Sequence, residues 1–92
     1  MQKALALTVF GRVQGVGFRY TTKMLADEYH LAGTVANKSD GSVYIEVVGP
    51  KQAVDQFVAA IKASPTPFSK VQKVIVQSLS PTPDFSKFRV IG

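Results

Sequence analysis

The sequence predicts an α+β fold in which an antiparallel sheet carries two helices on one of its faces. Several short segments alternate apolar and other residues, which is the period of a strand with one buried face. Two longer segments instead repeat apolar residues every three or four positions, which is the period of a helix. Each helical segment stands between two strand segments, and Gly or Pro clusters mark the boundaries.

The first half of the chain predicts a strand, a helix and a hairpin. Gly33 is expected to stop the helix, because glycine readily adopts the left-handed conformation that follows a helix C-terminus. Ser39-Asp40-Gly41 is typical of a tight turn, so the strands on either side of it form a hairpin. In chain order these elements are a strand over 4–11, a helix over 18–30, and strands over 34–38 and 42–48.

The second half predicts a helix followed by two strands. Gly49-Pro50 opens the helix, with Pro at the first helical position, where its missing N–H costs nothing. The run Ser64-Pro65-Thr66-Pro67 ends it. A strand over 71–79 and a short strand over 85–91 follow. We expect the last strand at a sheet edge, because charged side chains along it discourage pairing with another chain. The apolar stripe of the helix consists of Val54, Phe57, Val58 and Ile61. The charged residues of the last strand are Lys87 and Arg89.

The element order is β-α-β-β-α-β with a short extra C-terminal strand. Right-handed crossovers place both helices on one face of the antiparallel sheet. This is the ferredoxin-like sandwich, a fold that hosts many unrelated activities and therefore identifies none of them. A chain of 92 residues is expected to form one domain, 1–92.

Composition narrows the classes of function. The chain has no cysteine, which excludes disulfides and thiolate chemistry, and its single histidine, His30, makes a transition-metal site an unattractive hypothesis. We expect no cofactor. No apolar run is long enough to span a membrane and no signal-peptide pattern is seen, so we expect a cytoplasmic protein. The net charge of +5 favours anionic partners without choosing between a phosphate ester and a nucleic acid.

The run from Val9 to Arg19 begins as a strand, passes through a glycine-broken loop and ends in an arginine where a helix begins. Glycine permits positive φ, and successive N–H groups in such a turn form a concave site for anions. The first helical turn adds unpaired N–H groups, and Arg19 adds a forked cation suited to phosphate oxygens. The alternative is a connection that needs glycine only to turn, beside a solvated arginine.

Asn37 is the second candidate, because asparagine is disfavoured within strands and yet stands at the end of one here. Its amide both donates and accepts, so it can hold a water molecule in line with a phosphorus atom. The alternative is an asparagine that bonds its own backbone at the turn. His30 lies near a helix C-terminus, where its cationic form interacts favourably with the helix dipole. Neither paired carboxylates nor a Ser/His/Asp set is evident.

Two segments resemble the acylphosphatase family. The run Val9-x-Gly11-x-Val13-Gln14-Gly15-Val16-x-Phe18-Arg19 resembles the first motif of that family at every fixed position. The run Gly33-x-Val35-Ala36-Asn37-x-x-x-Gly41-x-Val43, with Gly49 beyond it, resembles the second. Thr34 departs from the family, which usually has an aromatic residue there, so we expect looser packing and altered stability near that strand.

The resemblance implies hydrolysis of the anhydride between a carboxylic acid and phosphoric acid, without a metal or a covalent phosphoenzyme. It implies that Arg19 and loop N–H groups bind the phosphoryl group, that Asn37 positions the attacking water, and that the substrate's phosphate takes the proton. Inorganic phosphate or a similar anion is then the product or an inhibitor. The phosphate-binding residues implied are Gln14, Gly15, Val16, Gly17, Phe18 and Arg19.

Other readings stay open. A basic ferredoxin-like domain could bind RNA, but such domains stack bases on sheet aromatics, and Phe10 and Tyr44 are the only obvious candidates here. We therefore expect no nucleic-acid partner. A domain that senses anions without turnover, or that acts inside a larger maturation protein, is a further alternative. The chain length favours a free-standing enzyme. Because no apolar helix face is left uncovered, we expect a monomer. The motif does not specify the acyl group of the substrate.

Overall fold

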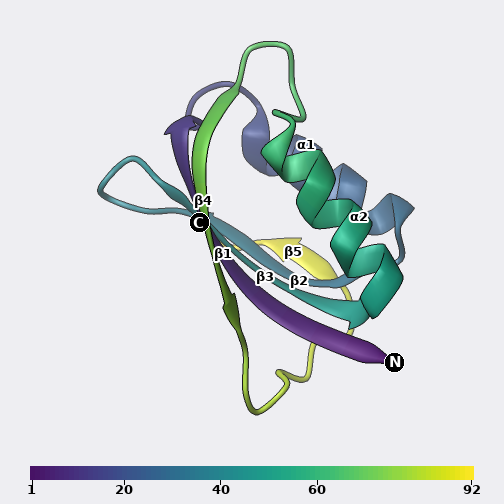
Figure 1. Cartoon of the computed structure of the whole chain (residues 1–92). Helices are drawn as coiled ribbons and strands as arrows, with labels where there is room; N and C mark the ends of the chain where they lie inside the picture. Colours follow the sequence, from purple (N-terminus) through teal and green to yellow (C-terminus); the bar gives the residue numbers. More distant parts are fainter.

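The chain folds into a five-stranded sheet with both helices packed against one of its faces, as Figure 1 shows. The computed structural model describes all residues from Met1 to Gly92. This arrangement confirms the predicted ferredoxin-like α+β fold. The elements are β1 (Gln2–Arg12), α1 (Phe18–Glu28), β2 (Ala32–Asn37), β3 (Val43–Pro50), α2 (Lys51–Lys62), β4 (Lys70–Ser78) and β5 (Phe88–Val90).

The strands lie in the order β4-β1-β3-β2-β5. The first four pair antiparallel, as predicted, whereas β5 pairs parallel with β2, so the sheet is mixed at that edge. The reason is topological, because β4 and β2 run in opposite directions and the chain turns back after β4 before it enters β5. Lys87 and Arg89 are exposed at this edge, where the sequence predicts them.

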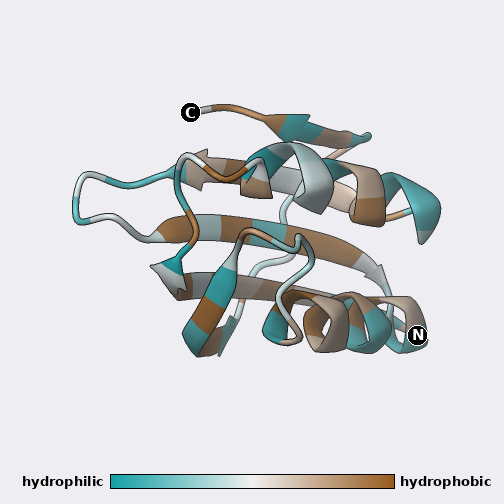
Figure 2. Cartoon of the chain, turned by 90° about the horizontal axis from the view of Figure 1, so that it is seen from above, coloured by the Kyte–Doolittle hydropathy of each residue, from teal (hydrophilic) through white to brown (hydrophobic).

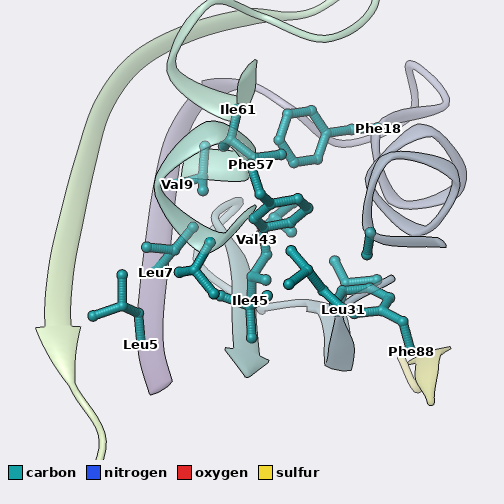
Figure 3. Packing of buried hydrophobic residues seen from close by; sticks show 14 of the residues in the cluster. Leu5, Leu7, Val9, Phe18, Leu31, Val43, Ile45, Phe57, Ile61 and Phe88 are labelled. Atoms are coloured by element: carbon teal, nitrogen blue, oxygen red, sulfur yellow. The ribbon is translucent and has the colours of Figure 1, made fainter. Parts of the chain in front are cut away.

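The core lies between the helices and the near face of the sheet (Figure 3). Leu5, Leu7 and Val9 of β1 all point into it, as their alternation predicts. Phe57 of α2 packs against Phe88 of β5, with ring centroids 6.2 Å apart. Phe18 and Ala26 of α1 belong to the same buried cluster, so both helices and the edge strand share one apolar core.

The first helix ends earlier than predicted. It stops at Glu28 rather than at His30, and His30 is the residue that adopts positive φ, at 58°. Gly33 lies inside β2 instead of capping the helix. A Cβ on Gly33 would collide with the backbone carbonyl of Glu46 on β3, so glycine serves a close approach between strands.

The second helix begins one residue later than predicted. Pro50 pairs with Gln2 as the last residue of β3 and stands as the N-cap, so α2 starts at Lys51. The final strand is also shorter than the predicted 85–91, because pairing with β2 runs only from Phe88 to Val90. No helix of the chain is long and apolar enough to cross a membrane.

Thr34 lies on β2, in register with Glu46 on one side and Arg89 on the other. Together with Phe85 it lines a surface cavity of about 300 Å³. Open space at this strand agrees with the absence of an aromatic side chain. The effect on stability stays a prediction.

Candidate active site

The loop over residues 13–17 joins β1 to α1 and turns at two glycines. Gly15 and Gly17 have φ values of 74° and 75°. A Cβ built on either would meet no atom within 4 Å, so the requirement for glycine comes from backbone conformation and not from lack of space.

This loop leaves its donors open. The backbone N–H groups of Gly15, Val16 and Gly17 donate no hydrogen bond within the protein. The bond from Thr21 N–H to Gly17 O (3.1 Å) closes the first turn of α1. That helix has no side-chain cap and no acidic residue in its first turn, so its N-terminal positive potential is also uncompensated.

The loop is nevertheless held from several sides. Val13, the first residue of the loop, and Phe18, the residue directly after it, are both buried in the core. The Gln14 side-chain amide donates to the carbonyls of Lys38 and Ser42, each at 2.8 Å, and so ties the loop to the β2–β3 hairpin. Figure 2 shows this hairpin projecting beyond the sheet with a hydrophilic tip. The Gln14 side-chain amide is therefore engaged within the protein, where it holds the loop against the hairpin.

Arg19 is the second residue of α1 and is half-buried beside the loop. Its Nη1 donates to the backbone oxygen of Gly92 at 2.5 Å. The three ion pairs of the chain are all made by lysines, so no carboxylate side chain pairs with the Arg19 guanidinium. The cation is oriented and remains available to an anion.

Asn37 ends β2, and its backbone N–H donates to the same Gly92 oxygen at 3.1 Å. Arg19 and Asn37 are thus joined through one acceptor from the C-terminal segment. The Asn37 Oδ1 atom is buried and has no hydrogen-bond partner, which is unusual for an amide oxygen. Sequence reasoning missed Gly92, because only the placement of β5 beside β2 brings it here.

The other polar residues lie elsewhere. Asp55 accepts from Lys3 and Lys51, at 2.7 and 2.8 Å, and these bonds lower the pKa of its carboxyl group. Asp27 pairs with Lys23 at 2.6 Å on the surface of α1. His30 lies just beyond α1, where the sequence places it. No three His, Cys, Asp or Glu side chains gather as a metal site would require.

The two aromatic candidates for base stacking are engaged with other side chains. Tyr44 donates from its hydroxyl to Glu46 at 2.7 Å, and this bond raises the pKa of the tyrosine to about 12. Lys38 lies over the Tyr44 ring at 5.1 Å, and Lys73 lies 6.0 Å from the Phe10 ring centroid. The Tyr44 hydroxyl and one face of each ring are thus engaged by neighbouring side chains of the chain itself.

Comparison with known proteins decides the family. The acylphosphatase family model matches residues 5–90. The chain belongs to the acylphosphatase family. It is 52% identical over 92 residues to an acylphosphatase of Latilactobacillus sakei, with all of both chains covered. The crystal structure of acylphosphatase from Bacillus subtilis covers 100% of both chains, with a TM-score of 0.93 and 41% identity.

The same fold also occurs within a larger protein. Full-length HypF, solved in a phosphate- and nucleotide-bound form, matches the whole chain with a TM-score of 0.92 and 33% identity, and the match covers 12% of HypF. The acylphosphatase relatives instead match this chain over their full length. Membership of the family identifies the chain as an enzyme, a hydrolase of the acylphosphatase type.

Proposed function

We propose that the chain hydrolyses acyl phosphates to a carboxylate and inorganic phosphate without a metal, using Arg19 and Asn37. The observation that carries this proposal is the set of open N–H donors at Gly15, Val16 and Gly17 beside the Arg19 guanidinium, which Gly92 orients and no carboxylate side chain neutralises. The chain acts as one domain over residues 1–92, as a cytoplasmic monomer.

The loop and Arg19 bind the phosphoryl group. Backbone N–H groups from Gly15 to Arg19 point at its oxygens, and the N-terminus of α1 adds positive potential. The Arg19 fork matches two phosphate oxygens, which a lysine point charge does not. Phosphoryl transfer needs mainly positioning and stabilisation of charge on the equatorial oxygens, and these groups supply both.

Asn37 positions the attacking water. Its side-chain amide, which both donates and accepts hydrogen bonds, holds the water in line with the phosphorus atom. Because Asn37 and Arg19 are linked through the Gly92 oxygen, the water and the phosphoryl group are set relative to one another.

The reaction needs no protein acid or base. The water oxygen bonds to phosphorus, the bond between phosphorus and the acyl oxygen breaks, and the carboxylate leaves with the electron pair. A carboxylate is a stable leaving group and needs no proton. The water's proton passes to an oxygen of the phosphate itself, and the carboxylates of Asp27 and Asp55 lie elsewhere, paired with lysines.

Gln14 contributes indirectly. Its side chain holds the loop against the hairpin through the Lys38 and Ser42 carbonyls, so its part in phosphate binding is to keep the donors in place. Phe18 acts similarly, since its buried ring anchors the start of α1 while its N–H remains at the helix terminus.

The test is hydrolysis of benzoyl phosphate by the purified chain in EDTA, followed by ultraviolet absorbance beside Arg19→Ala. We expect rapid turnover that resists the chelator and disappears in the variant. A folded wild-type chain without turnover would leave a non-catalytic anion-sensing domain as the better description. Turnover that survives in Arg19→Ala would place the reaction at another site.

A further inference from the structure

A cavity adjoins the phosphate-binding loop, and Asn37 is not among its lining residues. It has a volume of about 580 Å³ and is lined by Arg12, Gln14, Gly15, Val16 and Phe68. Gly15 and Val16 carry open N–H donors, so the cavity is continuous with the proposed phosphoryl site. Phe68 comes from the distant connection between α2 and β4.

We propose that this cavity receives the acyl group of the substrate and that Phe68 makes the enzyme favour aromatic and other apolar acyl groups. The inference rests on the proposed function, because it places the second half of the same substrate. It assigns a specificity to the site that the phosphate-binding motif does not contain.

In-line displacement supports this placement. The attacking water and the leaving oxygen lie on opposite sides of the phosphorus atom. The strand order places β4 on one side of β1, whereas β2, with Asn37 at its end, lies on the other side beyond β3. A water held by Asn37 therefore directs the leaving acyl group toward the side of β4, where Phe68 is.

The turn that carries Phe68 is fixed. Thr66 and Ser69, on either side of it, are both buried and bond one another, with Ser69 N–H donating to Thr66 Oγ1 at 2.9 Å and Ser69 Oγ to Thr66 O at 3.0 Å. Thr66 Oγ1 also donates to the carbonyl of Val16, at 3.4 Å. The turn is thus attached to the phosphate-binding loop itself.

Phe68 is exposed in spite of this rigid support. Its relative exposure is 72% and no other phenylalanine of the chain is exposed, while the neighbouring Thr66 and Ser69 are at 8%. A ring held outward beside a cavity presents a face for stacking at little cost in side-chain entropy. Its position at the mouth of a phosphate site makes an apolar acyl group the natural occupant.

Arg12 gives the cavity a positive charge, which suits an anionic leaving group. It lies opposite Lys70 in the β1–β4 register, both are exposed, and neither forms an ion pair. Like charges placed opposite one another on neighbouring strands repel, so this pair is better satisfied by an anion. The acyl oxygens become a carboxylate as the bond to phosphorus breaks, and that charge forms beside this cavity.

The experiment compares two substrates, benzoyl phosphate and acetyl phosphate, on wild type, Phe68→Ala and Phe68→Trp. We expect Phe68→Ala to lower kcat/KM for benzoyl phosphate about three- to tenfold, mainly through a higher KM. A loss of this size corresponds to the binding contribution of one aromatic pair. The kcat/KM for acetyl phosphate stays within about twofold, and Phe68→Trp retains the preference for benzoyl phosphate. Met24→Ala, which truncates another exposed apolar side chain, on α1, changes neither substrate.

Equal losses for both substrates in Phe68→Ala, or no loss for either, would overturn the inference. Failure of the proposed function is distinguishable, because wild type would then hydrolyse neither substrate. In that case the Kd values of benzoylphosphonate and acetylphosphonate, which cannot be hydrolysed at the carbon–phosphorus bond, decide the matter. Weaker binding of the benzoyl compound alone in Phe68→Ala supports the acyl site, and unchanged binding of both overturns it.

Discussion

The loop between β1 and α1 and the turn between β2 and β3 use glycine in the same way and treat their donors differently. Gly15 and Gly41 have φ values of 74° and 91°, and a Cβ on either would meet nothing within 4 Å. In the hairpin turn, Asp40 Oδ1 accepts from the N–H and Oγ of Ser42, at 2.9 and 2.6 Å.

The hairpin turn closes further bonds of its own. Lys38 N–H donates to Ser42 O at 2.8 Å, and Gly41 N–H donates to Lys38 O at 3.2 Å. The loop between β1 and α1 has no such internal acceptors for Gly15, Val16 or Gly17. Glycine therefore marks where the chain turns. Whether the N–H groups of the turn have acceptors within the protein distinguishes a structural turn from a binding loop.

The largest expected effect is at Arg19, which completes the open loop. Arg19→Lys keeps the charge and loses the fork, so we expect kcat/KM for benzoyl phosphate to fall by about 10²-fold or more, as for a lost donor to a transition state. Steady-state kinetics measures it, with circular dichroism to confirm the fold. Near-normal turnover in the variant would disprove the two-oxygen contact.

The variant Asn37→Ala distinguishes a role in positioning the attacking water from a role in binding phosphate. We expect kcat to fall by about 10²-fold, because the nucleophile loses its orientation. The Kd of inorganic phosphate, measured by competitive inhibition, changes far less, since Asn37 is assigned to the water. Equal losses in kcat and in phosphate affinity would move Asn37 into the anion site.

Most of the fold could be predicted from the sequence, because alternation over β1 and β3 and the stripe of α2 record which side chains are buried. Gly33 and Pro50 were misplaced for a physical reason. Each residue also suits a helix terminus, and only the pairing of Gly33 with Val47 and of Pro50 with Gln2 puts them in strands.

The candidate site was predictable in part. Arg19, Asn37 and the glycines lie in contiguous motifs, and the structure brings Arg19 and Asn37 to one Gly92 oxygen. Gly92 and Phe68 carry no local signal, since their positions depend on the path of the chain around the sheet. The occupied amide of Gln14 was equally invisible, because its acceptors lie 24 and 28 residues away.

Gly15→Ala and Gly41→Ala form a matched pair. Each forces an alanine into a left-handed conformation, so both should lower the free energy of unfolding by about 1–2 kcal/mol. Only Gly15→Ala should also weaken inhibition by inorganic phosphate. Denaturant unfolding and phosphate inhibition measure the two quantities. Phosphate affinity lost equally in both variants would mean that the two glycines do not differ in function.

The smallest expected effect concerns Asp40, whose hydrogen bonds from Ser42 lower the pKa of its carboxyl group below 3.8. A lowered native pKa stabilises the fold above the unfolded value, and that contribution is lost as the pH falls through the native value. Asp40→Ala should therefore lower Tm slightly at about pH 7 and not at about pH 2. Thermal melts at both pH values measure it, and kcat/KM at neutral pH stays unchanged. A Tm deficit that persists in acid would show that charge is not the source.

The most direct test of the account is an NMR titration of the backbone amides with inorganic phosphate. The open donors predict that the amide shifts of Gly15, Val16 and Gly17 move together and saturate, while those of Gly41 and Ser42 stay in place. In Arg19→Ala the same shifts should require far more phosphate. Phosphate-dependent shifts that spare the loop, or that are largest in the hairpin turn, would contradict the claim that unpaired N–H groups bind the phosphoryl group.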